Sequence, residues 1–204
     1  MNRRDVVVAG HRGDHETALA AVHHAEPTIR EAALGALERL DLLDAELLST
    51  VIGDPDVGVR RRAVELAARH PGVDLLGALH DPDDRVVEVA AWSCGEHEVV
   101  PDTVLERLIE LATGASDALV RESSAAALGA IGDPRGLPAI LAACDDKPAV
   151  RRRAVLALAP FYDVDGAGAG DQRVTAAVDR ALNDRDWQVR QAADDLHRAT
   201  RGTL

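Results

Sequence analysis

Histidine is the residue type in this chain best suited to bind a metal ion, and four histidines lie near the N-terminus: His11, His15, His23 and His24. A metal site needs ligands that converge on one point. Glycines at positions 10 and 13 argue against placing the first pair on one helix, and the second pair is adjacent, so its side chains point in different directions. We therefore expect solvated histidines and no metal site here.

A second candidate is acidic. The segment Asp163–Gly166 reads Asp-Val-Asp-Gly, which is how a calcium-binding loop begins, but residues 167–170 add only Ala and Gly. A calcium loop requires further acidic ligands. We therefore predict a flexible linker over residues 161–170. The chain also contains no G-x-S-x-G motif, no P-loop and no dinucleotide-binding fingerprint.

The two cysteines, Cys94 and Cys144, are far apart and form no C-x-x-C pair, so a disulfide framework is not expected. We expect two buried thiols in a reducing compartment. The apolar run after the first residues is too short for a signal peptide, and no run approaches the length of a membrane span. The expected location is cytoplasmic.

Arginine recurs in one pattern: a turn with Asp or Pro, an apolar residue, Arg, two further residues and Ala. Four copies are well formed and contain Arg30, Arg60, Arg151 and Arg190. Two copies are degenerate, with Val87 in place of the arginine and Ser124 in place of the alanine that follows Arg121. The copies recur about every 30 to 40 residues, which is the length of one helical hairpin with its turns.

Each copy predicts two helices. The second begins at the turn, where Pro in the first turn and Asp at the cap are favourable, and its apolar residues have helical spacing. We expect the first helices over residues 45–52, 73–79, 102–112, 137–143 and 174–182. The expected boundaries within a single solenoid are an N-terminal cap at 1–13 and hairpins at about 14–43, 44–70, 71–99, 100–132, 133–160 and 168–200.

The composition agrees with closely packed helices. Aromatic residues make up only 2% of the chain, and the apolar content of 47% is mostly Ala, Val and Leu. The formal net charge of −12 disfavours nucleic-acid binding, which draws on basic surfaces. Lys147 is the only lysine, so the basic residues are almost all Arg, as is typical of a GC-rich genome.

The segment at residues 127–140 reads ALGAIGDPRGLPAI. Together with the arginine pattern it resembles HEAT repeats, specifically the short repeats of phycobilisome-lyase-like proteins, over about residues 14–200. The resemblance implies an all-α fold: a right-handed α-α superhelix (solenoid) of about six HEAT-type helical hairpins.

In HEAT proteins a turn aspartate and a helix arginine form a ladder between neighbouring repeats, and the resemblance implies such a ladder here. An aspartate stands six residues before the arginine in three copies, which gives the expected ladder residues Asp54, Arg60, Asp145, Arg151, Asp184 and Arg190. Asp81 instead precedes Val87, while His24 and Ala115 occupy the aspartate position of their copies. The alternative role for these arginines is to bind phosphate or carboxylate.

The second helices are expected to line the concave, partner-binding side of a solenoid. The columns after the arginine, together with Glu96 at helical spacing from Trp92, give the candidate partner-binding residues Arg61, Glu65, Glu88, Trp92, Glu96, Glu122 and Arg152. Trp92 is distinctive because tryptophan is enriched at interface hot spots; the alternative is that it fills the core over Gly58 or Ala126. The charged residues could instead form ion pairs between repeats. Trp187 is expected to plug the last turn.

Three groups of HEAT-like enzymes provide the catalytic alternatives. Deoxyhypusine hydroxylase binds two irons through His-Glu pairs placed just after the repeat arginine, whereas His15-Glu16 and His97-Glu98 fall out of that register. Alkylpurine DNA glycosylases use a basic channel with aromatic rings, which this acidic chain does not match. Phycobilin lyases act as subunits that hold a chromophore, and no residue here marks a bilin site.

The sequence therefore predicts a non-catalytic protein–protein interaction module or scaffold, without a cofactor, that binds another protein along its second helices. Nucleic-acid and membrane partners are not expected. The alternative is a cofactor-handling or lyase-like enzyme subunit resembling the phycobilin lyases. The sequence indicates neither the identity of the partner nor the oligomeric state.

Overall fold

The computed structural model describes residues 1–162 and 171–201, and all regular secondary structure in these ranges is helical. The chain divides into two compact units, residues 1–93 and 94–204. The calcium-loop-like segment and most of the predicted linker, residues 163–170, lie outside the described residues.

The helices of the first unit follow one another closely. They are α1 (Arg3–Arg12), α2 (His15–Ala21), α3 (Pro27–Arg39), α4 (Ala45–Val51), α5 (Val57–Ala67), the 3₁₀ turn η1 (Ala78–His80) and α6 (Asp84–Gly95), whose last two residues pass into the second unit. The second unit contains α7 (Asp102–Gly114), α8 (Ala118–Ile131), the 3₁₀ turn η2 (Pro134–Gly136), α9 (Leu137–Ala143), α10 (Pro148–Ala157), the 3₁₀ turn η3 (Ala159–Phe161), α11 (Gln172–Leu182) and α12 (Trp187–Arg201).

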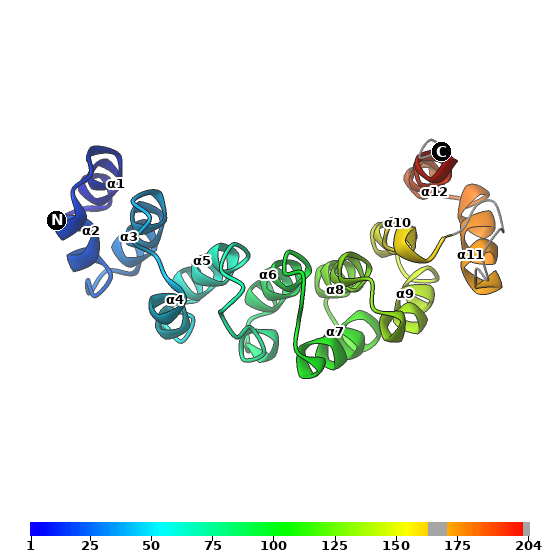
Figure 1. The fold of residues 1–204 in the computed structure, drawn as a ribbon, viewed down its shortest axis with the longest axis horizontal. Helices are drawn as coiled ribbons and strands as arrows, with labels where there is room; N and C mark the ends of the chain where they lie inside the picture. The colour runs from blue at the N-terminus through cyan, green and yellow to red at the C-terminus, as the bar shows by residue number, and fades with distance from the viewer. Residues whose placement is uncertain (163–170, 202–204) are drawn as a thin grey trace. The chain divides into compact units, whose positions relative to one another are not determined.

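Within each unit the helices form hairpins that stack in two layers (Figure 1). In the first unit α2 packs on α3 and α4 on α5, while α1, α3 and α5 lie side by side. In the second unit the hairpins are α7–α8, α9–α10 and α11–α12; their second helices α8, α10 and α12 form one layer and their first helices the other. The predicted all-α solenoid of helical hairpins is confirmed.

Turn aspartates and prolines set where the helices begin. Asp44 accepts a hydrogen bond from the Leu47 N–H at 2.8 Å, and Asp56 and Asp117 cap α5 and α8 in the same way. Proline stands in the first turn of α3 and α10, where its missing N–H leaves no helical bond unmade. These five helices therefore start at turns that the sequence marks with Asp or Pro.

Small and medium-sized aliphatic residues make the core of both units. The largest fully buried side chains are leucines such as Leu34, Leu48, Leu108 and Leu128. The tryptophans are not part of this core, because Trp92 is 44% exposed and Trp187 is 64% exposed. The expectation that Trp187 plugs the last turn is therefore wrong: it is the first residue of α12, and its ring lies largely in solvent.

The third hairpin lacks the expected first helix over residues 73–79. Only η1 forms there, although Val73 and Leu79 are buried as the apolar pattern requires. The Asp74 side chain accepts the Leu76 N–H at 2.9 Å, a local bond that competes with helix formation. Glycines at positions 72 and 77 weaken the helix further.

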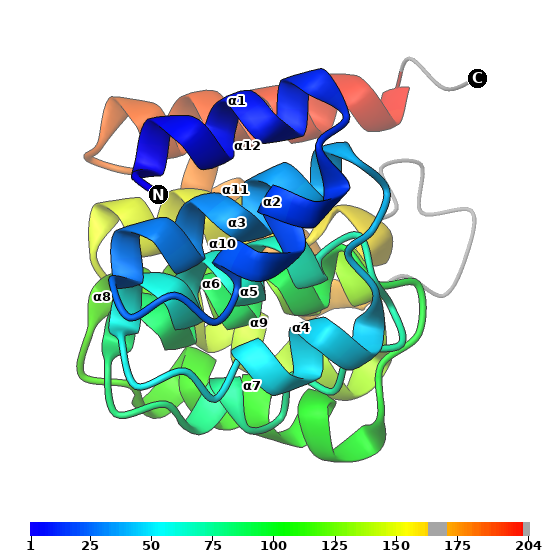
Figure 2. The same cartoon turned by 90° about the vertical axis from the view of Figure 1, so that its left-hand side faces the viewer.

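The N-terminal residues expected to form a cap contain a complete helix. Asn2 accepts the Asp5 N–H at 3.0 Å and Asp5 accepts the Asn2 N–H at 2.9 Å, which makes a capping box at the start of α1. This helix lies along α3, as α3 lies along α5 (Figure 2). α1 therefore adds one more helix to the second-helix layer, and we use "second-helix face" for the exposed side of that layer, α1 included.

Small residues let neighbouring second helices approach closely. A Cβ atom on Gly129 of α8 would lie 2.5 Å from the Cα of Ala157 on α10. Gly10 of α1 stands in the same relation to Ala36 of α3, at 2.8 Å. Such distances allow no side chain, so glycine is required where these backbones meet.

Replacing Gly129 by alanine is therefore expected to destabilise the protein by about 1–3 kcal/mol through overpacking. Gly114→Ala is the matched control, because no atom of the described residues lies within 4 Å of the added Cβ; it should leave stability unchanged or raise it by up to about 1 kcal/mol. Urea denaturation followed by circular dichroism measures both. If both variants changed the stability equally, the close approach of α8 and α10 at Gly129 would be contradicted.

Ser124 has a buried hydroxyl group with no hydrogen-bond partner among the described residues. It stands where the repeat pattern has alanine, so Ser124→Ala is expected to stabilise the protein by up to about 1 kcal/mol. Ser93 is equally buried, but its Oγ donates to the Val64 carbonyl oxygen at 2.8 Å. Ser93→Ala should instead cost about 1 kcal/mol, and a change of the same sign in both denaturation curves would refute this difference.

Candidate binding surface

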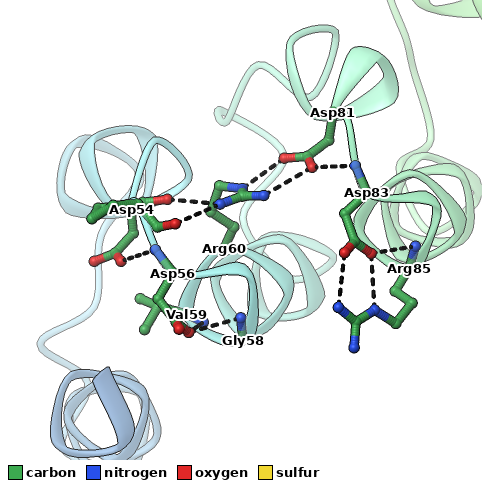
Figure 3. Close-up of polar contacts among 9 residues, drawn as sticks. Asp54, Asp56, Gly58, Val59, Arg60, Asp81, Asp83 and Arg85 are labelled. Carbon is green, nitrogen blue, oxygen red and sulfur yellow. Dashed lines mark hydrogen bonds and ion pairs between the residues drawn. The ribbon is translucent and has the colours of Figure 1, made fainter. Parts of the chain in front are cut away.

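The repeat arginines lie near the start of the second helices, and Arg60 shows how each is held (Figure 3). Its Nη1 donates to the carbonyl oxygens of Asp54 and Pro55 in the turn that starts its own helix, at 3.0 and 3.2 Å. Its Nε and Nη2 donate to both carboxylate oxygens of Asp81 in the next turn, at 2.7 and 3.0 Å. One guanidinium thus joins two successive turns.

The same rung occurs four times in the described residues. The pairs are Arg30–Asp54, Arg60–Asp81, Arg121–Asp146 and Arg151–Asp184. In each pair Nε and Nη2 reach the two carboxylate oxygens, with N···O distances between 2.5 and 3.0 Å. The arginine side chains are only 9–15% exposed. Their donors are used within the protein, which leaves them unsuited to bind a ligand.

The rungs are charge-assisted: they raise the pKa of the ladder arginines and lower the pKa of Asp54, Asp146 and Asp184. Hydrogen bonding to the next aspartate raises the pKa of the ladder arginines. The Arg121 and Arg151 guanidiniums lower the pKa of Asp146 and Asp184. At Asp54 burial raises the pKa, but the bond from Arg30 and the Asp56 N–H outweigh it, so the net change is downward. Asp54, Asp146 and Asp184 are therefore held in their charged form.

The structure shows how the ladder residues pair: each ladder arginine binds the aspartate of the following copy, so Asp54 pairs with Arg30 and Arg60 pairs with Asp81. Asp184 pairs with Arg151, and Arg190 forms no rung within the described residues. Asp145 is not a rung residue: its neighbour Asp146 reaches Arg121 instead, since in this turn the carbonyl bound by Arg151 also belongs to Asp146. Arg30, Arg121, Asp81 and Asp146 were missed as ladder residues.

The two ends of the ladder are His24, at the first aspartate position, and Arg190, at the last arginine position, and each forms hydrogen bonds within its own turn. His24 stands at the first aspartate position, and its Nδ1 accepts the Glu26 N–H at 3.0 Å, just as Asp54 accepts the Asp56 N–H at 2.8 Å. At the other end, the acceptors of Arg190 among the described residues are the carbonyl oxygens of Asp184 and Arg185 in its own turn. Between them, Val87 and Ala115 are residue types that cannot form the intervening rung.

Beyond the ladder, the second-helix face of the first unit contains a polar hollow of about 370 Å³ between α1, α3 and α5. Its charged lining consists of Arg3, Glu31, Arg39, Arg61, Arg62 and Glu65. Gly35 leaves room for the Arg62 guanidinium, whose Nη2 lies 3.5 Å from where a Cβ would be. Arg62 Nη1 binds Glu65 Oε2 at 2.9 Å, and Arg39 Nη1 donates to the Gly35 carbonyl at 3.2 Å.

The structure brings two of the predicted partner-binding residues, Arg61 and Glu65, into this hollow. Trp92 lies on α6, which packs against α5 through the bond from Ser93 to the Val64 carbonyl, and its exposure of 44% disfavours the role of core filler. Glu88 is half-buried on the same helix. Glu96 is exposed but follows the last residue of α6, so it does not share the helix with Trp92 as its spacing had suggested.

Glu122 and Arg152 meet each other in the second unit. The Glu122 carboxylate is 14% exposed and lies 3.7 Å from both Arg152 and Arg153, which joins α8 to α10. This arrangement matches the ion pair between repeats that the sequence left open as an alternative. Arg152 remains 40% exposed.

Sequence reasoning missed Arg3, Arg39 and Arg62 as members of the hollow. Arg3 was missed because the residues before the first hairpin were expected to form a cap. The spacing of Asn2 and Asp5 is a helix-start signal that could have placed Arg3 on a helix. Arg39 and Arg62 carry no such signal, because only the packing of α3 on α5 brings them together.

The remaining candidates offer little chemistry. A hollow of about 360 Å³ near the last turn includes Cys144, whose pKa is raised to about 12 by burial and by Asp145. Its thiol is therefore a poor nucleophile at neutral pH. Three or more possible metal ligands gather nowhere in the described parts of the chain. No helix of these parts is long and apolar enough to cross a bilayer.

Stacked helical hairpins joined by arginine–aspartate rungs define an α solenoid. Residues 73–159 match the family of HEAT repeats, so the resemblance seen in the sequence is confirmed for the repeat type. The narrower likeness to phycobilisome-lyase-like repeats stays a prediction. No curated protein is a significant sequence match.

Solved structures similar to this chain include engineered and designed proteins. An engineered protein from the Northeast Structural Genomics Consortium covers 99% of this chain and 98% of its own, at 16% identity and a TM-score of 0.61. A second engineered protein from the same consortium is 19% identical, covers 92% of this chain and 98% of its own, and has a TM-score of 0.65. A designed armadillo repeat protein, solved with the peptide (KR)4, is 14% identical, covers 91% of this chain and 98% of its own, and has a TM-score of 0.64. At these identities the likeness concerns the fold alone.

Replacing Asp184 by asparagine tests the ladder. The folded-state pKa of Asp184 lies below its unfolded value of about 3.9, so its contribution is present above about pH 4 and is lost as pH falls through the folded pKa. At pH 7 the variant should lose about 1–3 kcal/mol of stability, because the Arg151 guanidinium keeps no carboxylate. The difference from wild type should shrink below pH 4, as measured by urea denaturation across pH.

Asp194→Asn is the matched control for this experiment. Asp194 pairs with Arg198 on α12, but both side chains are more than half exposed. Exposed pairs of this kind contribute about 0–1 kcal/mol, so this variant should stay close to wild type at pH 7. A loss as large as that of Asp184→Asn would show that the ladder pair has no special role.

Proposed function

We propose that this protein is a non-catalytic binding module that engages another protein along its second-helix face. Exposed Trp92 is the observation that carries the proposal. Trp92 is 44% exposed, and the buried residues of its helix are mostly Ala and Val. The tryptophan ring is therefore not needed to fill the core. Large aromatic rings on a rigid surface are typical anchors of protein interfaces. A cytoplasmic location remains the prediction made from the sequence.

The surroundings of Trp92 support the same role. It aligns in the repeat with Glu65, which lines the polar hollow on α5, so an apolar anchor and charged groups share one face of the first unit. The ladder arginines are engaged within the protein, which gives this face a rigid base. The designed armadillo repeat protein with a similar fold was solved with a bound peptide, and an extended partner segment is the form of ligand we propose here.

The replacement Trp92→Ala tests the proposal. Wild-type protein used as bait in a lysate of the source organism should retain a protein partner, and Trp92→Ala should retain about tenfold less or none, because hot-spot tryptophans contribute at least about 2 kcal/mol. Quantitative mass spectrometry of the eluates measures the retained amounts. Circular dichroism of each bait checks that it is folded.

Trp187→Ala is the control bait, because it also removes an exposed tryptophan but lies in the last turn. It should retain the partner as wild type does. Equal loss with both variants would mean general stickiness of exposed rings, and equal retention would remove Trp92 from the site. A chromophore that copurifies with the protein would favour the lyase-like alternative instead.

A further inference from the structure

The hollow between α1, α3 and α5 has the opposite charge to the chain as a whole. It is lined by four arginines and two glutamates, whereas the formal net charge of the protein is −12. A cleft lined mainly by one sign of charge raises the local concentration of groups of the opposite sign. The hollow is therefore a place where an anionic group would be stabilised.

Most of this positive charge is not neutralised from within. Arg62 binds Glu65, and Arg39 donates only to an uncharged carbonyl oxygen. Arg3, Arg39 and Arg61 form no ion pair with any residue in ranges 1–162 and 171–201. The ladder arginines differ in this respect. Arg60 is the residue before Arg61, and its Nε, Nη1 and Nη2 all donate to acceptors within the protein.

We propose that this hollow binds an acidic segment of the partner protein, with its Asp or Glu carboxylates placed on Arg3, Arg39 and Arg61. The inference rests on the proposed function and specifies the chemistry of the bound segment. A guanidinium presents a planar fork of donors that matches a carboxylate in two parallel hydrogen bonds. The three unpaired guanidiniums come from three different helices, so they suit carboxylates spaced along an extended chain.

The lining favours a protein segment over a nucleic acid. Glu31 and Glu65 can accept the backbone N–H groups of a peptide, which the sugar–phosphate backbone of a nucleic acid lacks. The lining contains no aromatic ring on which a base could stack. The acidic remainder of the chain also opposes a long polyanion more strongly than a short one.

A fluorescein-labelled octaglutamate peptide tests the proposal by fluorescence anisotropy with the full-length protein. Wild type should bind it saturably, and binding should weaken as salt rises. Arg61→Glu should weaken binding by about tenfold or more, since it removes a charge-assisted contact and adds repulsion. Arg61→Gln, which removes only the charge, should show an intermediate loss and covers the case in which Arg61→Glu fails to fold.

Arg12→Glu is the matched control. Arg12 is exposed on α1, outside the hollow, and its replacement changes the net charge by the same amount. It should alter octaglutamate binding by less than about threefold. Equal weakening by Arg12→Glu and Arg61→Glu, or no saturable binding to wild type, would overturn the proposal.

A labelled 20-nucleotide single-stranded DNA probe covers the other class of polyanion. If it bound more tightly than octaglutamate and lost affinity with Arg61→Glu, the hollow would be a nucleic-acid site and the proposal would be wrong. In the lysate experiment, a partner that is lost with Trp92→Ala but kept with Arg61→Glu would overturn the acidic segment while leaving the binding module in place. Loss with both variants would support the two proposals together.

Discussion

The guanidinium–carboxylate rung is the interaction on which the stacking of the hairpins depends. Each ladder arginine holds its own turn through Nη1 and the next turn through Nε and Nη2, and Asp54, Asp81 and Asp184 each also accept an N–H of their own turn. A hairpin stacked in another register would leave these largely buried charges without partners, which is costly. The ladder therefore specifies how hairpins stack as much as it stabilises them.

The ladder also determines what the second-helix face can present. Because the rung uses the first arginine of a second helix, the next residue, such as Arg61 after Arg60, is left on the surface. Small residues allow adjacent second helices to pack closely, which leaves no space between them for long side chains. Long side chains therefore extend from the second-helix face into solvent. Gly35 adds room for Arg62, and the arginines of α1, α3 and α5 gather around one hollow as a result.

The hairpins could be predicted because apolar spacing and turn residues are local signals within a short stretch of chain. The rungs could be predicted only in kind, because the partner of an arginine lies 21 to 33 residues further on, while an equally regular aspartate stands in its own turn. The choice of Asp146 over Asp145 depends on turn geometry. The hollow could be predicted only through Arg61 and Glu65, because its other members meet through packing between helices.

Each rung consists of an arginine from one hairpin and an aspartate from the next, so the ion pairs repeat with the hairpins along the chain. The hairpins with Asp54 and Arg60 and with Asp146 and Arg151 each contribute the aspartate of one rung and the arginine of the next, so duplicating or deleting such a hairpin at equivalent turns leaves no rung residue unpaired. The step from Val87 to Ala115 lacks both residue types of a rung, so joining or separating chain at that step changes no rung. Arrays of this kind can change length by whole hairpins, and that step is where segments of different origin can be joined without adjusting a rung.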